Sequence, residues 1–454
     1  MAAKRVLLLL SSDRLSYPLV RFLSEEGKKF KWKVIIGCMF DPHVRKRMMQ
    51  QELADELEIV DIATSKACDQ AIKKSDLVIG MVTDTLLLEV ADSCLQHRKT
   101  LISPAALTRQ LAARKAQAKE HKVLLLMDCG FSPGLDHITA KKAIDNIHAK
   151  GGTITSFRTY SGSFIASGEN PLGFRLTETA GELLTLFRQN NRHLMKGRMQ
   201  HIPYHKLFER GEKVVLQNHE DITAIPAGDS LYYRKIYSLA NAHTVVKGKL
   251  VPKGFDRMWD IFLRLGLTDS TCKIDLCGAG SFYHFLDSFL PCTEAGTLEE
   301  RLQSYAGVNG ADIAKLKWLG LFDNTWLEHQ QDITPAHILQ HLLETRLSAQ
   351  PDDQDYAVMQ HHLAYQYRDD QYELTATLVS KGASDQDSAL ANAIALTCGA
   401  AAKSVLLGSV TVKGLHIPVI REIYDPILNE LSDSGVAFHV EDKRVSDHES
   451  VEKV

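Results

Sequence analysis

The sequence predicts an α/β protein with a doubly wound parallel sheet in its N-terminal part, followed by an α+β domain. Two observations predict this fold class. Residues 1–128 alternate short apolar runs with segments of helical periodicity, and such alternation builds parallel βαβ units with right-handed crossovers. After Asp128 the strand-like and helical segments are grouped, which is typical of a mixed or antiparallel sheet beside helices. A length of 454 residues is enough for two or three domains.

The N-terminal elements follow from the positions of apolar residues. Strands are expected wherever four or five apolar residues adjoin, and helices where apolar residues recur every three or four positions. The expected strands are 5–10, 33–38, 59–61, 77–81, 100–103 and 123–127. The expected helices are 15–26, 42–57, 67–74, 85–96 and 107–121. Together these segments form a first domain over residues 1–128, which we expect to bind a dinucleotide.

The remaining chain divides into a second domain at 129–412 and a C-terminal segment at 413–454. Its expected strands are 153–163, 213–215, 242–250, 356–366 and 373–380. Its expected helices are 140–149, 257–265, 298–305, 335–346, 388–407 and 421–432. The charged tail beyond Asp442 is expected to be frayed, because it offers no apolar face to bury.

Composition excludes several classes of function. The chain has 53 basic and 56 acidic residues, a net charge of −3, so no basic excess points to a nucleic-acid partner. No apolar run approaches the roughly 18 residues that cross a bilayer, so we expect no membrane segment. The eight cysteines include no Cys-x-x-Cys pair, which favours reduced thiols in a cytoplasmic protein over a disulfide framework or a zinc site. We therefore expect a cytoplasmic protein without a metal site.

The turn after the first expected strand is the place where a dinucleotide pyrophosphate would lie. Its residues are Ser11, Ser12 and Asp13, and we assign them as candidate cofactor contacts. Glycines are normally needed there, because the backbone must approach the pyrophosphate and direct helix N–H groups at it. This turn has none, and Asp13 adds a negative charge. Capping of the following helix is the alternative role of all three residues.

Two further residues are candidates for the cofactor site. Asp41 follows the second strand, where a carboxylate can accept a hydrogen bond from a ribose 2′-hydroxyl and favour NAD. Arg45 or Arg47 can instead hold a 2′-phosphate and favour NADP, so the choice between NAD and NADP stays open. Thr83 follows the fourth strand and should lie at the open edge of the same crevice.

A series of motifs in the second half makes the chain recognisable. In collinear order it resembles the saccharopine dehydrogenase (glutamate-forming) family. The matching segments are DCGFSPGLDH at 128–137, AKGGTITSF at 149–157, NPLGFR at 170–175, LKWLGL at 316–321, TLV at 377–379, GLHIPV at 414–419 and EIYDPIL at 422–428. The similarity covers nearly the whole chain.

The resemblance implies a fold and an activity. The implied fold is a Rossmann domain, an α+β substrate and dimerisation domain, and a C-terminal segment that returns to the Rossmann side. Family members oxidise the secondary amine of saccharopine with NAD(P) in lysine metabolism, giving an imine that water opens, or they run the reverse reaction. A small amino-acid substrate and a homodimer are therefore expected. The cofactor supplies the hydride chemistry, while the protein binds carboxylates and moves protons.

The chain departs from the family pattern at positions that would contact ligands. The family's Gly-x-Gly turn is replaced by the serines and aspartate at 11–13. Ser132 stands where the family has an aspartate, Ser161 where it has a cysteine, and Asn392 where it has a lysine. Gly228 stands where the family has an arginine, which would be a natural bidentate partner of a substrate carboxylate.

Five other residues are candidates for substrate binding. Arg175 is the strongest remaining carboxylate ligand, and Tyr160 could line the same cleft. Asn170 precedes a proline in a glycine-bounded loop and must hydrogen-bond either the loop or the substrate. Asp229 and Ser230 either contact substrate or cap a helix.

The catalytic residues remain unassigned by the sequence. Asp136 and His137 can form an acid–base pair or begin a helix, and the helix role is favoured. Two functional hypotheses follow from the motifs and the departures. The first is an NAD(P)-dependent oxidoreductase that acts on the C–N bond of an amino-acid-derived amine. The alternative is a homologue that kept the fold, lost redox turnover and acts as a binding or regulatory protein.

Overall fold

The chain forms two compact units in a computed structural model. The structure describes residues 3–10, 15–38, 58–166, 170–177, 179–188, 191–216, 219–274, 280–292, 296–325, 333–384, 387–434 and 436–445. The first unit consists of Met1–Ile154 and Tyr365–Val454, and the second of Thr155–Ala364. This division differs from the one expected from the sequence, because 129–154 and 365–412 belong to the first unit.

The first unit contains a seven-stranded sheet in the order β16-β6-β5-β4-β1-β2-β3, in which all neighbouring strands are parallel. The strands are β1 (Arg5–Leu10), β2 (Lys33–Cys38), β3 (Glu58–Asp61), β4 (Leu77–Met81), β5 (Thr100–Ile102), β6 (Leu124–Leu126) and β16 (Gly414–His416). Apart from the half-buried edge strand β3, their apolar side chains are mostly buried, as expected for a parallel sheet covered on both faces. The predicted doubly wound fold is confirmed, and its strand order reverses between β1 and β4.

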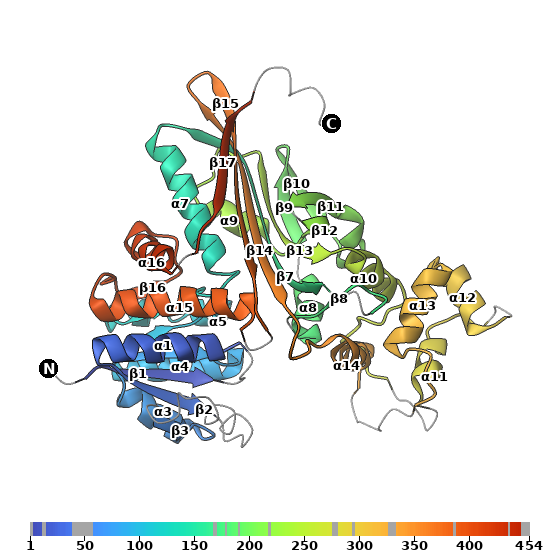
Figure 1. The fold of residues 1–454 in the computed structure, drawn as a ribbon, viewed down its shortest axis with the longest axis horizontal. Coiled ribbons are helices and arrows are strands. Elements are labelled where there is room, and N and C mark those ends of the chain that lie inside the picture. The colour runs from blue at the N-terminus through green and yellow to red at the C-terminus, as the bar shows by residue number, and fades with distance from the viewer. Residues whose placement is uncertain are drawn as a thin grey trace. The chain divides into compact units, whose positions relative to one another are not determined.

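The helices of the first unit come from both ends of the chain. They are α1 (Tyr17–Phe30), α3 (Ser65–Lys73), α4 (Asp84–His97), α5 (Arg109–Ala112), α6 (Lys115–Glu120), α7 (Leu135–Ala149), α15 (Ala389–Leu407) and α16 (Arg421–Asp433). Figure 1 shows α1 and α15 side by side. Gly399 permits this approach, because a Cβ atom there would lie 2.5 Å from the Phe22 ring.

The α15 helix is long and apolar enough to cross a membrane by length and composition alone. However, 67% of its most apolar window is buried inside the protein. Buried core helices of soluble proteins commonly have the same length and composition, so the helix is weak evidence for a membrane span. Its bounds agree with the predicted Ala-rich helix at 388–407.

Several expected elements of the first unit differ from the structure. The helix expected at 107–121 is broken into α5 and α6, and α7 begins five residues earlier than expected. The expected frayed tail is wrong as far as Arg444, because β17 (His439–Arg444) pairs antiparallel with β15 (Asp370–Lys381). This strand is almost wholly exposed and polar, so no apolar alternation marks it. The helix expected at 42–57 lies outside the described residues.

The second unit has a mixed sheet, which confirms its predicted α+β character. The strands follow the order β10-β9-β13-β7-β14, with β12 pairing with β13 and β11, and β8 with β7. β13 runs parallel to β7 and antiparallel to β12 and β9. The bounds are β7 (Thr153–Ala166), β8 (Phe174–Arg175), β9 (Asn191–Met195), β10 (Arg198–Ile202), β11 (Glu212–Leu216), β12 (His219–Pro226), β13 (Thr244–Pro252) and β14 (Asp355–Tyr367).

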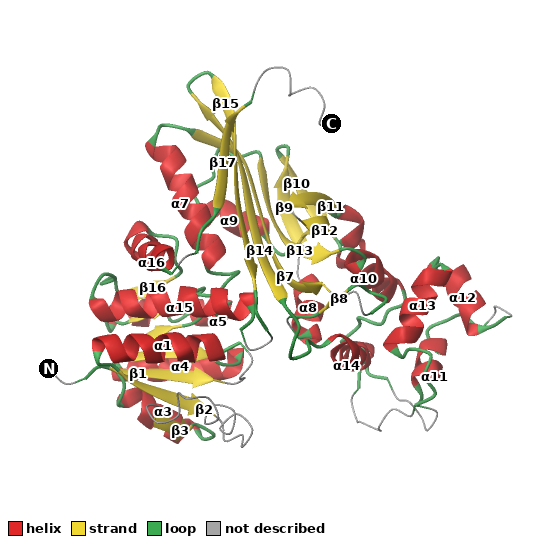
Figure 2. Ribbon diagram, viewed as in Figure 1, coloured by secondary structure: helices red, strands yellow, loops and turns green. Residues whose placement is uncertain are grey.

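The helices of the second unit surround an aromatic core. They are α8 (Ala180–Phe187), α9 (Ser230–Ile236), α10 (Phe255–Arg264), α11 (Phe282–Asp287), α12 (Leu298–Ala306), α13 (Gly310–Leu319) and α14 (Pro335–Leu347), shown in red in Figure 2. The rings of Phe255 and Trp259 stack with centroids 4.7 Å apart, and Phe187 packs against both. This buried face of α10 joins the strands to the helical part of the unit.

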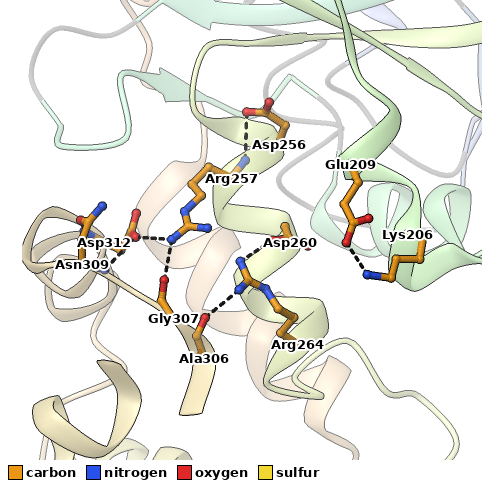
Figure 3. A network of polar contacts seen from close by, with 10 residues as sticks. All are labelled: Lys206, Glu209, Asp256, Arg257, Asp260, Arg264, Ala306, Gly307, Asn309 and Asp312. Carbon is orange, nitrogen blue, oxygen red and sulfur yellow. Dashed lines mark hydrogen bonds and ion pairs between the residues drawn. The ribbon is translucent and has the colours of Figure 1, made fainter. Parts of the chain in front are cut away.

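The polar face of α10 is tied to the turn between α12 and α13. Figure 3 shows Arg257 donating to the Asp312 carboxylate at 2.8 Å and to the Gly307 carbonyl at 3.0 Å. One turn further on, Arg264 donates to the Ala306 carbonyl at 2.8 Å. Two arginines of one helix therefore satisfy carbonyl groups at the end of α12 that have no partner within that helix.

Candidate functional site

The carboxyl edge of the parallel sheet is the first candidate site. In a doubly wound sheet the ligand crevice lies at this edge, where the strand order reverses. Thr83 follows β4 there; its side chain is exposed and makes no capping hydrogen bond to α4. The other predicted cofactor contacts, Ser11, Ser12, Asp13 and Asp41, lie outside the described residues, so these assignments stay predictions.

A network of hydrogen bonds fixes the loops that follow β5 and β6. The Asp128 carboxylate accepts from the Leu107 N–H at 2.6 Å and lies 3.1 Å from Nε2 of His137. Asp128 is 4% exposed and His137 is completely buried. The Ser103 hydroxyl donates to the Gly80 carbonyl at 2.7 Å, which ties the end of β5 to β4.

The loop before α7 is held by a second carboxylate. Asp136 accepts from the Gly134 N–H at 2.7 Å, the His137 N–H at 2.8 Å and the Ser132 hydroxyl at 2.8 Å. Gly134 has φ +143°, and a Cβ atom there would lie 2.1 Å from the Gly130 carbonyl oxygen. Asp136 is 1% exposed, so the structure supports its helix-initiating role over direct acid–base catalysis.

The chemistry of this edge fits a nicotinamide dinucleotide. The strand order matches that of dinucleotide-binding sheets. The exposed Thr83 hydroxyl and the first N–H groups of α4 are hydrogen-bond donors beside the order reversal. Thr83 and the first turn of α4 are therefore the described groups that would hold part of the cofactor.

The second candidate site is a pocket within the second unit. It is small and partly open to solvent. Two cationic residues, Arg175 and Lys249, and the hydroxyl pair Ser163 and Thr177 line it. The rest of its lining is mainly apolar: Phe164, Phe174, Leu176, Leu183, Leu250, Val251, Pro252 and Phe255. Cations above an apolar floor are suited to a small organic anion with a hydrocarbon stem.

Arg175 is the predicted substrate residue that the structure places in this pocket. Its side chain is 13% exposed, and Nε lies 3.3 Å from the Asp353 carboxylate. Its guanidinium also approaches the Ser348 carbonyl at 3.4 Å. The Ser163 and Thr177 hydroxyls lie 2.6 Å apart, between β7 and the residues that follow β8. The four other predicted substrate residues do not line the pocket.

Asn170 holds its own loop together. Its Oδ1 accepts from the N–H groups of Leu172 and Gly173, both at 3.0 Å, and its Nδ2 donates to the Phe174 carbonyl at 3.0 Å. The side chain is 7% exposed. Of the two alternatives given for Asn170, the structure shows the loop contact, and a substrate contact stays a prediction.

Asp229 and Ser230 begin α9. Asp229 accepts from the Leu231 N–H at 3.1 Å and forms an ion pair with Arg192. The Ser230 hydroxyl accepts from the Lys247 N–H at 2.8 Å and is 1% exposed. The structure therefore shows the capping alternative for Asp229, whereas the Ser230 hydroxyl binds the backbone of β13.

Tyr160 is buried in the sheet of the second unit. It is 4% exposed and packs among Phe164, Leu250 and Val358. Burial raises the pKa of its hydroxyl to about 12, although nearby Arg158 lowers it. Tyr160 is consequently neutral near pH 7 and poorly suited to act as a base.

Lys249 was missed by the sequence reasoning. A signal for it was present, because lysines 247 and 249 alternate with apolar residues in an expected strand and so share one face. No group of three or more His, Cys, Asp or Glu side chains that could hold a metal ion occurs among the residues described.

The fold and the two sites define a class of protein: a dinucleotide-fold α/β chain with a separate α+β domain that contains a pocket lined by Arg175 and Lys249. A family model for the saccharopine dehydrogenase C-terminal domain matches residues 130–436. The chain belongs to the saccharopine dehydrogenase family.

Curated relatives agree with this assignment. The chain is 25% identical to a saccharopine dehydrogenase (NADP(+), L-glutamate-forming) of Pyricularia oryzae, covering 95% of this chain and 97% of that one. It is also 25% identical to the mouse mitochondrial alpha-aminoadipic semialdehyde synthase over 97% of this chain. That match spans 48% of the mouse protein, so the chain has about half its length. These relatives support an NAD(P)-dependent oxidoreductase.

Solved structures agree with the fold. Apo saccharopine dehydrogenase (L-Glu forming) of Saccharomyces cerevisiae matches with a TM-score of 0.85 at 22% identity, over 98% of this chain and 100% of that one. Homospermidine synthase of Legionella pneumophila, in complex with NAD, matches with a TM-score of 0.54 at 12% identity. It covers 97% of this chain and 91% of that one. The predicted family resemblance and fold class are thus confirmed.

Proposed function

We propose that this chain is an NAD(P)-dependent oxidoreductase that acts on the C–N bond of an amino-acid-derived secondary amine in lysine metabolism. The observation that carries the proposal is its similarity, over 97% of the fungal protein's length, to a saccharopine dehydrogenase (NADP(+), L-glutamate-forming). The parallel sheet with its order reversal supports a dinucleotide site, and the two cationic residues of the pocket support a carboxylate substrate.

A bound nicotinamide would accept a hydride from the amine carbon, and the resulting C=N bond would be opened by water. The chain's own residues bind and orient the substrate. Arg175 and Lys249 would hold a carboxylate beside the apolar lining around Phe255. Asp353 keeps the Arg175 guanidinium in place through its contact at Nε.

Steady-state kinetics with saccharopine and either NADP⁺ or NAD⁺, followed at 340 nm, test the proposal. Replacing Arg175 by alanine should raise the KM for saccharopine by about 10- to 100-fold, because a charge-assisted hydrogen bond contributes about 1.5–3 kcal/mol. The KM for the cofactor should stay unchanged. Arg198→Ala, on exposed β10, is the matched control. A wild-type chain that turns over neither cofactor would refute the proposal.

Two observations favour the alternative of a binding or regulatory protein without redox turnover. Ser132 stands at the family's aspartate position, and its hydroxyl is used to hold Asp136. Gly228 stands at the family's arginine position with φ +78°, and its N–H donates to the Asn191 side chain at 2.7 Å. Saturable saccharopine binding by calorimetry without turnover would support this alternative.

Cofactor choice, cellular location and assembly are further parts of the proposal. NADP is the proposed cofactor, because the fungal relatives are saccharopine dehydrogenases (NADP(+), L-glutamate-forming), and NAD is the alternative. A cytoplasmic homodimer follows from the family resemblance and the cysteine pattern. Analytical ultracentrifugation of the purified chain tests the dimer; a single species at the monomer mass of 50.7 kDa would refute it.

A further inference from the structure

The loop after β6 begins with a residue in an unusual conformation. Asp128 has φ +58°, a left-handed backbone that few residues other than glycine, asparagine and aspartate adopt readily. It is also 4% exposed. A buried carboxylate in this conformation is costly unless hydrogen bonds compensate it, so the surrounding contacts indicate why it is there.

The Asp128 carboxylate joins two separate segments. One oxygen accepts from the Leu107 N–H at 2.6 Å, in the segment after β5, and the other lies 3.1 Å from Nε2 of His137, in the first turn of α7. Two backbone hydrogen bonds join the same segments. The Asp128 N–H donates to the Ala105 carbonyl at 3.0 Å, and the Cys129 N–H donates to the Ser103 carbonyl at 3.0 Å. The carboxylate thereby completes the connection between the β5 and β6 loops.

These loops lie on the half of the sheet that faces the second mononucleotide. In a doubly wound sheet a dinucleotide crosses the order reversal, with its adenosine on the β1–β3 half. The β4–β6 half is left for the nicotinamide mononucleotide. The hydrogen-bond network around Asp128 joins the loops after β5 and β6, and the Ser103 hydroxyl extends this network to the Gly80 carbonyl at the end of β4.

We propose that Asp128 is a positioning residue for the nicotinamide end of the cofactor. Its carboxylate is too buried to touch the cofactor, and it acts by holding segments 103–107 and 129–134 in one preformed arrangement. A preformed edge binds its ligand without the entropic cost of ordering a loop on binding. This inference rests on the proposed function.

Two substitutions separate the carboxylate from the backbone conformation. Asp128→Gly keeps the left-handed conformation available and removes the side chain. Asp128→Asn also tolerates this conformation, and it keeps an oxygen for Leu107 and a polar group for His137. Asp76→Ala is the matched control, because Asp76 accepts from the Arg5 N–H at 2.7 Å at the opposite edge of the same sheet.

Binding of NADPH and of NADH, compared with 2′,5′-ADP and ADP-ribose, tests the inference by calorimetry. The glycine variant should bind the better dinucleotide about tenfold more weakly, roughly the cost of ordering one more backbone residue, and bind the adenosine fragments unchanged. The asparagine variant should recover most of the affinity. Hydrogen exchange should speed up in segment 103–107 of the glycine variant only, with the Asp76→Ala control like wild type.

The possible outcomes separate the inference from the proposed function. Equal loss of dinucleotide and adenosine-fragment binding, or no loss at all, would overturn the positioning role. An asparagine variant as weak as the glycine variant would overturn it as well. A wild-type chain that binds neither dinucleotide overturns the proposed function and removes the cofactor role of Asp128, whatever the exchange data show.

Discussion

Replacing Arg257 by alanine should lower the free energy of unfolding by about 2 kcal/mol, since a hydrogen bond to a charged group contributes about 1.5–3 kcal/mol. The guanidinium donates at 2.8 Å to the Asp312 carboxylate, whose side chain is 5% exposed, and at 3.0 Å to the Gly307 carbonyl (Figure 3). The substitution therefore leaves a buried carboxylate without its cation.

The magnitude follows from the burial of the two partners. Breaking a fully buried ion pair costs about 3–5 kcal/mol, because the remaining charge is uncompensated. The Arg257 side chain is 39% exposed, so solvent screening lowers this value. The Asn309 N–H also still donates to the Asp312 carboxylate at 3.0 Å. Together these points place the loss near 2 kcal/mol, between the exposed and buried limits.

The loss should depend on pH. Burial raises the pKa of Asp312, but hydrogen bonds from Arg257 and Asn309 outweigh it and leave this pKa below its ordinary value. A carboxylate with a lowered folded-state pKa contributes stability above its unfolded pKa, about 3.9, and loses it as the pH falls further. The difference between wild type and variant should thus be full at pH 7 and smaller below about pH 4.

Urea denaturation monitored by circular dichroism, at pH 7 and below about pH 4, measures these differences in the free energy of unfolding. A double-mutant cycle with Asp312→Asn isolates the pair, and Arg198→Ala serves as an exposed-arginine control. A loss at pH 7 of less than about 0.5 kcal/mol, the range of ordinary surface substitutions, would refute the reasoning. So would a loss that grows as the pH falls.

Four other substitutions have defined expected outcomes. Gly134→Ala should cost more than about 3 kcal/mol or prevent folding, because its Cβ would overlap the Gly130 carbonyl. Gly151 has φ +85°, and an added Cβ atom would have nothing within 4 Å, so Gly151→Ala should cost only about 1–2 kcal/mol. Thermal unfolding of both variants measures this, and equal losses of stability in the two would contradict it. Asn170→Ala should destabilise by about 2–3 kcal/mol through three lost hydrogen bonds, and an unchanged melting temperature would be inconsistent with the loop contacts. Tyr160→Phe should leave the pH profile of saccharopine turnover between pH 6 and 9 unchanged, because the Tyr160 pKa of about 12 keeps its hydroxyl neutral in this range. A shifted profile would argue against this.

The sequence predicted β1, β2, β4, β5 and β6 well, because each is a short run of mainly buried apolar residues. It also predicted β3, which is only half-buried, and it did not predict β16 as a strand. The first strand and the one at 33–38 have the predicted bounds. It did not predict β9, β10 or β17, whose residues are largely polar. In β10, for example, only Ile202 is buried, so no alternation distinguishes the strand from a loop. β9 and β10 pair with each other as a hairpin, and β17 pairs with β15, about 70 residues earlier in the chain.

The candidate site was predictable only in part. Arg175 was predicted because arginine is the usual carboxylate ligand. The structure places it in a pocket, and its contact with substrate stays a prediction. Asp229 and Asn170 have side chains whose local backbone contacts account for their position, and sequence cannot separate such contacts from ligand contacts. The hydrogen-bond network around Asp128 could not be predicted from the sequence either, because only the folded chain brings residues 107, 128 and 137 together.

Binding of NADPH and NADH to the purified full chain tests the central claim most directly. Ser12→Asp is the companion variant, because a second carboxylate in the turn after β1 should repel a pyrophosphate. The account predicts micromolar affinity of the wild type for at least one dinucleotide and weaker binding by the variant. No binding of either dinucleotide up to millimolar concentration would contradict it and favour a homologue that kept the fold without redox turnover.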